Sequence, residues 1–533
     1  KLDVDAWMEG CINRSDIDLT TLEKVGSNIT GLFSTTVKRT VDNSADGGFI
    51  KDCHNYGNLK GGGYIYGLGK TIEAGWSVYD SSNEGEITAT NGYAAGLFDK
   101  VSSYSAKLET LCRIERCFNT GNVSSTNTKA AGLMCEASKY SYIADCYNTG
   151  NITSKKAGLT AAGLIGQNNG VVERCFNAGD INTDCNAAGG LVGYHAGGEL
   201  DYPARLSNCF NIGNVTSTYS GTNSNGNAGG IGGYLTAPNE AAPHIVENCY
   251  NTGRVTANKR VAGLFAGAFR PFSIVRNCYN SGKIVCLEPD DKDRYYWSGT
   301  TFTNSYTYGA DSVFMLAGHS NCYYDADVNP GIKRADGSIY GEFRSVPGSK
   351  KTTEQLRALE VSEAFNLTGH GGYPVLAAFA QHDAAAAGSA LLLLADNKGE
   401  NYENITGAIM LVAPEGAEWT AADIDDQAET QAEEPAAPAA RITFDNGKAV
   451  PTALGKVLLT CTYRGYKKDF LLNVTKATEL GIDSNFAGKE VKAVTFIDLQ
   501  GRPVSAPAAG QLYIVRTVYT DGTMKVEKRI ARD

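Results

Sequence analysis

Short apolar runs separated by glycine and asparagine recur along the first two thirds of the chain. One run is small and apolar and contains A-G-L or a close variant. A second places an apolar residue three positions before a cysteine, and a Val, Ile or Leu follows soon after it. Runs of about 4 to 6 residues bounded by turn residues are typical of strands. The pattern predicts a unit made of a strand, a turn and a strand.

The cysteine segment is a repeat with about ten copies. The six closest copies are CFNTGNV at 117, CYNTGNI at 146, CFNAGDI at 175, CFNIGNV at 209, CYNTGRV at 249 and CYNSGKI at 278. The weaker copies are CINRSDI at 11, CHNYGNL at 53, CYYDADV at 322 and NEGEI at 83, which lacks the cysteine. The copies at 117, 146 and 175 are 29 residues apart, so the base period is 29.

Units of this length cannot enclose a core alone, but stacked units bury a continuous one. The sequence therefore predicts an all-β fold, a parallel β-helix or β-solenoid of about ten coils. At about 4.8 Å per coil the stack is roughly 48 Å long. A helical solenoid is the rival, but the 61 glycines and the repeated N-x-G steps would interrupt its helices. Because Gly and Asn tolerate positive φ, we expect each N-x-G step to form a corner of the coil.

The pairing of A-G-L-[IVF]-G with C-[FY]-N-x-G-x-[VI] resembles the GLUG motif, a repeat of bacterial surface and secreted proteins. The resemblance covers roughly residues 11 to 380. It includes NCYYDADV, TTEQLRALEVSEAFNLTG and GYPVLAAF, which are similar to the cap that ends such arrays. It implies an adhesin-like protein of a bacterial surface.

Two further β domains are expected after residues 1–380. Residues 381–475 alternate like an antiparallel β-sandwich and are similar to bacterial Ig-like modules. Residues 476–533 form the second domain, and about the last 45 of them resemble the C-terminal sorting domain of type IX secretion cargo, through D-L-Q-G-R, L-Y-I-V-R and D-G-x-x-K-V-x-K-x-I. This resemblance implies an exported protein of a Gram-negative cell, attached to or released from its outer surface. Residues 423–440, DIDDQAETQAEEPAAPAA, are expected to form a solvated loop or linker.

Charge and hydropathy narrow the class of protein. The formal charge of −10, from 48 bases and 58 acids, argues against nucleic-acid binding, which needs clustered Lys and Arg. No apolar run approaches the roughly 18 residues of a membrane span; the best is AAAAGSALLLLA at 384–395. Because the chain starts at Lys1, a removed secretory signal is expected.

Three residues of the repeat are candidates for chemistry or binding. The cysteine is interpreted as an internal ladder of thiols, with occasional disulfides or a metal site as alternatives. The asparagine is expected to hydrogen-bond to backbone groups of adjacent coils. The aromatic residue after the cysteine would form a row of rings on the outer face, a platform for sugars or protein partners. The alternatives are that a bend packs the rings inside or that a loop covers them. The candidate ligand-binding residues are Phe118, Tyr147, Phe176, Phe210, Tyr250 and Tyr279.

A weak calcium candidate follows the last repeat. Asp325, Asp327 and Asn329 have the D-x-D-x-N spacing of a calcium loop. The pattern then fails, since Pro330 stands where such a loop has Gly and Asp336 where it has Glu. We expect no metal and no other cofactor.

No catalytic motif is present. The six histidines never form H-E-x-x-H, and there is no G-x-S-x-G. The positions two before the repeat cysteine hold no cluster of acids on consecutive coils, as a polysaccharide-degrading β-helix enzyme would need. The sequence thus favours a non-enzymatic adhesin-like protein, secreted or on the outer-membrane surface. We expect a monomer whose solenoid binds a glycan or protein on a host or neighbouring cell. A polysaccharide-degrading enzyme and a structural stalk are the alternatives.

Overall fold

The computed structural model describes most of the chain. The described residues are 1–3, 6–20, 28–37, 48–102, 111–155, 160–199, 201–219, 227–236, 244–258, 260–268, 273–287, 298–299, 320–329, 350–394, 405–424, 441–475, 491–498, 502–504, 512–520 and 523–530. They divide into two compact units. The first comprises Lys1–Ala395, Met410–Thr420 and Leu459–Phe470, and the second Asp396–Ile409, Ala421–Leu458 and Leu471–Asp533.

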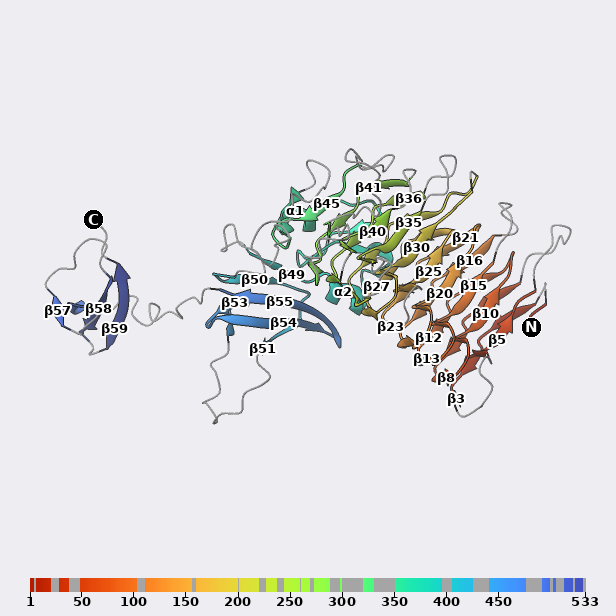
Figure 1. Cartoon of the computed structure of the whole chain (residues 1–533), viewed down its shortest axis with the longest axis horizontal. Coiled ribbons are helices and arrows are strands. Elements are labelled where there is room, and N and C mark those ends of the chain that lie inside the picture. The colour runs from red at the N-terminus through yellow and green to blue at the C-terminus, as the bar shows by residue number, and fades with distance from the viewer. Residues whose placement is uncertain are drawn as a thin grey trace. The chain divides into compact units, whose positions relative to one another are not determined.

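A parallel β-solenoid makes up most of the first unit, as predicted (Figure 1). Each complete coil has five short strands, and equivalent strands of successive coils pair in parallel. The expected strand–turn–strand unit was therefore too simple, because runs of two to five residues bounded by bends each form a separate strand. The stack has ten coils, counted by the strands that directly follow the repeat cysteine or its equivalent, and NEGEI at 83 belongs to the third coil. The sheet that these strands form has an eleventh strand, which comes from the segment after the last repeat.

The sheet before the repeat cysteine has nine strands: β1 (Trp7–Glu9), β6 (Phe49–Lys51), β11 (Ser77–Tyr79), β16 (Cys112–Glu115), β21 (Ser141–Ala144), β26 (Val171–Glu173), β31 (Arg205–Ser207), β36 (His244–Glu247) and β41 (Ser273–Arg276). The sheet after it holds the aromatic residue and the asparagine: β2 (Ile12–Asn13), β7 (His54–Asn55), β12 (Ser82–Asn83), β17 (Phe118–Asn119), β22 (Tyr147–Asn148), β27 (Phe176–Asn177), β32 (Phe210–Asn211), β37 (Tyr250–Asn251), β42 (Tyr279–Asn280), β45 (Tyr323–Asp325) and β46 (Lys350–Lys351).

The third sheet follows the N-x-G step: β3 (Ile17–Leu19), β8 (Leu59–Gly61), β13 (Ile87–Ala89), β18 (Val123–Ser125), β23 (Ile152–Ser154), β28 (Ile181–Thr183), β33 (Val215–Ser217), β38 (Val255–Ala257) and β43 (Ile284–Cys286). The fourth precedes the glycine of A-G-L: β4 (Ile29–Thr30), β9 (Ile65–Tyr66), β14 (Ala94–Ala95), β19 (Ala130–Ala131), β24 (Thr160–Ala162), β29 (Ala187–Gly189), β34 (Asn227–Gly229), β39 (Arg260–Ala262) and β44 (Ser298–Gly299). The fifth follows A-G-L: β5 (Phe33–Thr35), β10 (Gly69–Ile72), β15 (Phe98–Val101), β20 (Met134–Ala137), β25 (Ile165–Asn168), β30 (Val192–Ala196), β35 (Gly232–Thr236) and β40 (Phe265–Ala268).

Two apolar clusters fill the interior of the stack. One contains the repeat cysteines and the leucines of A-G-L, and the other contains the residues of the third and fourth sheets. Within one coil the chain passes from Cys117 in the first cluster to Val123 in the second, and returns from Ala130 to Leu133. Asn119 lies at the first crossing and Gly132 at the second, so the asparagines and these glycines separate the two clusters.

The asparagines form a hydrogen-bonded ladder, as predicted, but the bonds between coils join side chains, and the bonds to backbone lie within one coil. Each Nδ2 donates to Oδ1 of the asparagine in the next coil at 2.6 to 2.8 Å, from Asn13 to Asn280. From Asn55 onward, Nδ2 also donates to the carbonyl of the N-x-G glycine in its own coil at 2.7 to 2.9 Å. Both amide hydrogens are thus used inside a buried layer.

The N-x-G step is a corner between the second and third sheets, as expected, but positive φ is not the reason. The glycines of N-x-G do not have left-handed φ values; the residue directly before the repeat cysteine does, as in Arg116 (φ 54°), Asp145 (φ 54°) and Arg174 (φ 49°). The N-x-G glycine is needed for close approach instead. A Cβ atom on Gly121 would lie 1.9 Å from the carbonyl oxygen of Gly85 in the preceding coil.

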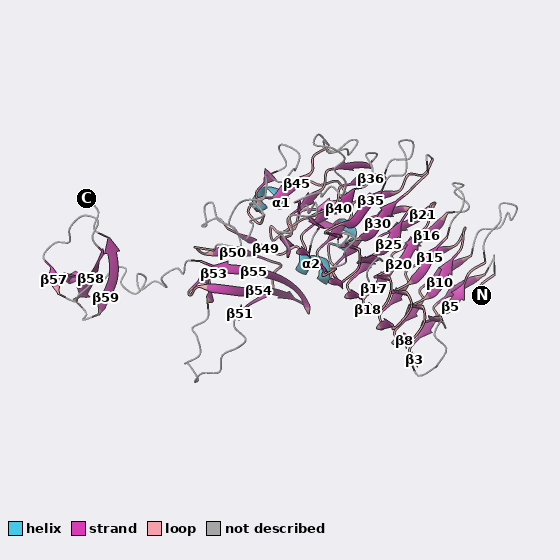
Figure 2. Cartoon of the chain, in the orientation of Figure 1, coloured by secondary structure: helices cyan, strands magenta, loops and turns pink. Residues whose placement is uncertain are grey.

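A cap segment follows the solenoid. It comprises β47 (Phe365–Asn366) paired with β48 (Val375–Leu376), a 3-10 helix at Ala377–Phe379, and the helices α1 (Thr353–Arg357) and α2 (Asp383–Gly388). Figure 2 shows these helices as the few non-strand elements in an otherwise β chain. The alanine run that opens the predicted sandwich domain is therefore helical at residues 383–388.

The remaining elements are strands: β49 (Leu391–Leu393), β50 (Ile409–Val412), β51 (Glu418–Ile424), β52 (Ile442–Asp445), β53 (Lys448–Pro451), β54 (Gly455–Tyr463), β55 (Tyr466–Val474), β56 (Val491–Ile497), β57 (Pro503–Val504), β58 (Leu512–Tyr519) and β59 (Met524–Ile530). The last four form an antiparallel sheet of order β57-β56-β58-β59. Strand β51 lies in a stretch where no strand was expected, and most of the predicted linker at 423–440 lies outside the described residues. In the described part of the chain, no helix is long and apolar enough to cross a membrane.

Candidate functional site

The aromatic residues that follow the repeat cysteines form an ordered stack, here called the aromatic ladder. Its six rings have centroid distances of 4.8 to 5.2 Å and interplanar angles of 2 to 13°. The ladder consists of Phe118, Tyr147, Phe176, Phe210, Tyr250 and Tyr279. The cysteines belong to the inner core and the rings to another cluster, so the two side chains point to opposite sides of the strand, as alternation requires.

The cap segment covers most of the aromatic ladder. Phe379 contacts the rings of Tyr147 and Phe176 edge-on, and the hydroxyl of Tyr250 donates to the carbonyl of Pro374. Phe365 packs against Tyr250 at a centroid distance of 5.6 Å. Phe176, Phe210, Tyr250 and Tyr279 are consequently buried, with at most 1% of their surface exposed.

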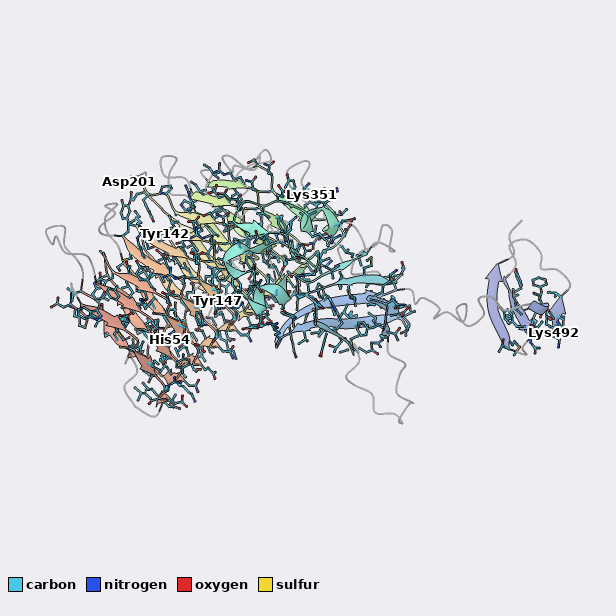
Figure 3. All side chains as sticks on the ribbon, turned by 180° about the vertical axis from the view of Figure 1, so that it is seen from behind. His54, Tyr142, Tyr147, Asp201, Lys351 and Lys492 are labelled. Carbon is cyan, nitrogen blue, oxygen red and sulfur yellow. The ribbon has the colours of Figure 1, made fainter. Side chains whose placement is uncertain are left out.

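Only the first two rings of the ladder retain exposed surface. Phe118 and Tyr147 are half-buried, and their parallel rings lie 4.8 Å apart. In Figure 3, His54 lies toward the first coils and Tyr147 closer to the cap. The proposed role in ligand binding required rings that face solvent. Four of the six candidates do not meet that condition, since the cap covers them, and Phe118 and Tyr147 meet it in part.

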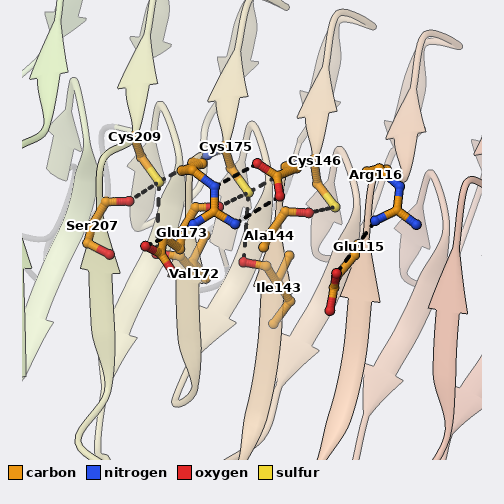
Figure 4. A network of polar contacts seen from close by, with 12 residues as sticks. Glu115, Arg116, Ile143, Ala144, Cys146, Val172, Glu173, Cys175, Ser207 and Cys209 are labelled. Carbon is orange, nitrogen blue, oxygen red and sulfur yellow. Dashed lines mark hydrogen bonds and ion pairs between the residues drawn. The ribbon is translucent and has the colours of Figure 1, made fainter. Parts of the chain in front are cut away.

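The repeat cysteines form the expected ladder of thiols. The repeat cysteines are thiols rather than disulfides, and they are buried except Cys11. The thiol of Cys146 donates to the carbonyl of Ala144 at 3.1 Å (Figure 4). It also accepts the N–H of Cys117 at 3.4 Å. Burial raises the pKa of the Cys146 thiol, which keeps it protonated and poorly nucleophilic.

The residues before the cysteines form a polar ladder on the outside of the same corner. Arg116 binds Asp80 of the preceding coil through two nitrogens at 2.6 and 3.1 Å, and Arg174 binds Asp145 at 2.8 and 2.9 Å. Figure 4 shows Glu115 beside Arg116 in this network.

The four acids two positions before a repeat cysteine are all in ion pairs, and the first of them, Glu9, contacts Lys51 at 3.3 Å. Glu115 and Glu173 contact neighbouring arginines at 3.0 to 3.6 Å, and Glu247 contacts Arg276. Each of these carboxylates is thus engaged by a basic side chain of its own or a neighbouring coil.

The calcium candidate residues are occupied by the chain itself. Asp325 accepts hydrogen bonds from the hydroxyls of Ser281 and Thr353, and Asp327 accepts the N–H of Thr353 at 2.9 Å. Asn329 accepts the N–H of Ile284 at 3.0 Å. These bonds fasten the start of α1 to the last coils, and burial raises the pKa of Asp325 to about 7. No group of three or more His, Cys, Asp or Glu side chains suited to a metal occurs among the described residues.

A small cleft opens beside the aromatic ladder, where the solenoid meets α2 and the first residues of β55. Asp180 and Asn214 line it from the solenoid, and Lys467 and Asp469 line it from β55. Its volume is about 210 Å³. This cleft could not be predicted from the sequence, because its walls come from segments almost 300 residues apart.

These features define a repeat protein built on a parallel β-solenoid, closed at one end by a cap that folds over its side. The family model described as the GLUG motif matches residues 184–216, which run from one A-G-L signature to the next cysteine segment. The match confirms the predicted GLUG repeat. Neither the curated proteins nor the solved structures give a match to this chain.

Proposed function

We propose that this protein is an exported, non-enzymatic, adhesin-like protein of a cell surface that binds glycans through the uncovered end of the aromatic ladder. The observation that carries the proposal is the stacked pair Phe118 and Tyr147, which remains partly exposed where the cap ends. Aromatic surface of this kind is a common contact for sugar rings and for protein partners. The repeat cysteines and asparagines, by contrast, make contacts inside the solenoid.

The paired carboxylates support a binding role rather than catalysis. Glu115, Glu173 and Glu247 are each held by arginine. A glycosidase needs two carboxyl groups on either side of a scissile bond, one of them protonated at working pH. An enzyme that degrades polysaccharides stays the alternative for the test below, and a structural stalk is the other.

The C-terminal strands support export. Residues 491–530 contain four antiparallel strands, β56 to β59, in a small sheet. Their sequence resembles the sorting domain of type IX secretion cargo. We propose that this part directs the protein to the outer surface of a Gram-negative cell.

The test is a glycan and matrix-protein binding array with the full chain, with product analysis on the same polysaccharides. We expect binding without new reducing ends or unsaturated products. Phe118→Ala should weaken that binding about tenfold. The matched control is Tyr64→Ala, which removes another partly exposed aromatic ring, from the second coil. Depolymerisation of a polysaccharide would contradict the proposal and support the polysaccharide-degrading enzyme. Absence of binding would contradict it and support the structural stalk.

A further inference from the structure

The cleft beside the aromatic ladder has walls held in place by a buried lysine. Lys468 is 8% exposed, and its ammonium group donates to the carbonyls of Gly388 and Ala390 at 2.6 and 2.7 Å. It also contacts the hydroxyl of Thr252 in the solenoid at 3.3 Å. One side chain thus joins β55, the end of α2 and the eighth coil, so the cleft is formed before any ligand arrives.

Helix α2 approaches the solenoid closely at the same place. A Cβ atom on Gly388 would lie 2.1 Å from Cδ1 of Ile212. Ala384 and Ala387 of α2 and Ala178 of the solenoid complete an apolar wall, and Tyr466 adds an aromatic ring. Small side chains on both sides leave the space that the cleft occupies.

Two carboxyl groups, those of Asp180 and Asp469, line the cleft. Asp180 accepts the N–H of Asn214 at 2.8 Å, and Asp469 accepts the hydroxyl of Thr460 at 2.6 Å. Among the described residues, neither carboxylate has an ion pair. Burial raises the pKa of Asp180, and the nearby charge of Asp469 adds to the rise, whereas the hydrogen bonds from Asn214 oppose it. Hydroxyl groups of a ligand would supply the missing donors.

The charges of the lining favour a neutral ligand over a cation. Lys467 and Lys468 line the same cleft as the two carboxylates, so its formal charges balance. Calcium requires six to eight oxygen ligands, and two ammonium groups would repel it. A volume of about 210 Å³ corresponds to roughly seven waters, which suits one small ring rather than an extended chain.

We propose that this cleft binds a single neutral sugar residue of a glycan. Asp180 and Asp469 accept hydrogen bonds from adjacent hydroxyls, Lys467 donates to a ring or hydroxyl oxygen, and the apolar face of the sugar lies toward Tyr466 and the alanines. The inference deepens the proposed glycan-binding function and rests on it. The ligand class follows from a lining that combines acceptors, donors and an aromatic ring in a small cleft.

The test uses Asp180→Asn in the full chain. The equivalent residues of the adjacent coils are Asn151 and Asn214, so the solenoid accepts asparagine at this position. The matched control is Asp16→Asn, the same ladder position in the first coil, where Asp16 accepts the N–H of Asn58 at 2.7 Å. Binding is measured by saturation-transfer NMR with a panel of neutral hexoses and N-acetylhexosamines.

We expect at least one sugar of the panel to bind, with affinity lowered about tenfold by Asp180→Asn and unchanged by Asp16→Asn. Lys467→Ala, an exposed position, should also weaken binding. Equal binding by the wild type and Asp180→Asn overturns the assignment of the cleft, as does the absence of binding. A rise in melting temperature with calcium that Asp180→Asn abolishes also overturns it, in favour of a cation.

The two proposals fail separately. If Phe118→Ala weakens binding on the array and Asp180→Asn does not change the affinity for free sugars, the proposal for the aromatic ladder is kept and the proposal for the cleft is rejected. If Asp180→Asn weakens the binding of free sugars and Phe118→Ala does not change binding on the array, the proposal for the cleft is kept and the proposal for the aromatic ladder is rejected.

Discussion

Gly132 packs directly against the side chain of Asn148 in the next coil. A Cβ atom at Gly132 would lie 2.5 Å from Cγ of Asn148 and 1.9 Å from the carbonyl oxygen of Gly163. The same contact recurs along the stack, for example between Gly96 and Asn119 at 2.5 Å. The A-G-L and C-x-N signatures of the repeat are therefore two sides of one contact, which explains why they occur together.

Replacing Gly132 by alanine should strongly destabilise the solenoid. The added methyl group meets backbone on one side and the buried amide ladder on the other, so neither neighbour can move cheaply. We expect the free energy of unfolding to fall by about 3 kcal/mol or more. Gly62→Ala is the control, because nothing lies within 4 Å of its Cβ position. Equal denaturant midpoints for the two variants would contradict the packing argument.

The asparagine ladder predicts a second effect. Asn148→Ala removes one rung and leaves Nδ2 of Asn119, Oδ1 of Asn177 and the carbonyl of Gly150 without their partner. We expect a loss of about 2 to 4 kcal/mol in chemical denaturation. Asn122→Ala breaks an exposed bond from the N–H of Asn151 and should cost under about 1 kcal/mol. A ladder that contributes nothing would give both variants the stability of the wild type.

The coil without a repeat cysteine predicts which substitution that position tolerates. Ser81 occupies it, donates to the carbonyl of Tyr79 at 2.7 Å and accepts the N–H of Cys53 at 3.1 Å. Cys146→Ser should therefore cost under about 1.5 kcal/mol, because serine makes the same two bonds. Cys146→Leu should cost about 3 kcal/mol from overpacking. Thermal melts of both variants check this, and a larger loss for serine than for leucine would refute it.

Two buried histidines predict acid sensitivity. His195 and His244 are fully buried, with ring centroids 5.1 Å apart. Burial lowers the pKa of His195 well below its usual value and that of His244 to about 4. Below pH 6.5 the unfolded chain binds protons there while the folded chain does not. Stability is therefore complete above pH 6.5 and falls as the pH drops toward 4, by on the order of 3 kcal/mol for His244 alone.

Substitution separates these histidines from the other titrating groups. His195→Leu copies Leu235, its equivalent in the next coil, and should flatten the loss of stability between pH 6.5 and 4. His54→Ser is the control, because it copies Ser82 and removes a histidine that lies outside the buried pair. Denaturant titrations at pH 7, 5.5 and 4.5 measure the slope, and the same slope in all three proteins would refute the assignment.

The repeat residues were the most predictable part of this protein. Their period fixed the stacking register, because identical side chains at equal spacing can satisfy one another only when coils lie directly above each other. The thiol ladder and the amide ladder follow from that register. The left-handed residue that precedes the repeat cysteine was not predicted, although Asp or Asn occupies that position in seven of the nine coils from Asp52 to Asn321 and both residue types favour positive φ.

The exposure of the aromatic ladder depended on tertiary structure. Phe118 and Phe210 occupy equivalent positions with the same residue, yet one is half-buried and the other fully buried. The difference comes from Phe365 and its neighbours, which are more than 150 residues further along the chain than Phe210 and pack over the last rings. A repeat pattern cannot indicate where such a segment ends.

By itself, the sequence determined an all-β stack of about ten coils, the GLUG repeat and the inward cysteine and asparagine ladders, because these depend on local spacing and on identical neighbours. Only the tertiary structure decided which rings stay exposed, that the oxygens of Asp325 and Asp327 fasten the cap, and that Asp180 and Asp469 share a cleft. Each of these depends on contacts between segments with no common periodicity, and such contacts form only when the chain folds back on itself.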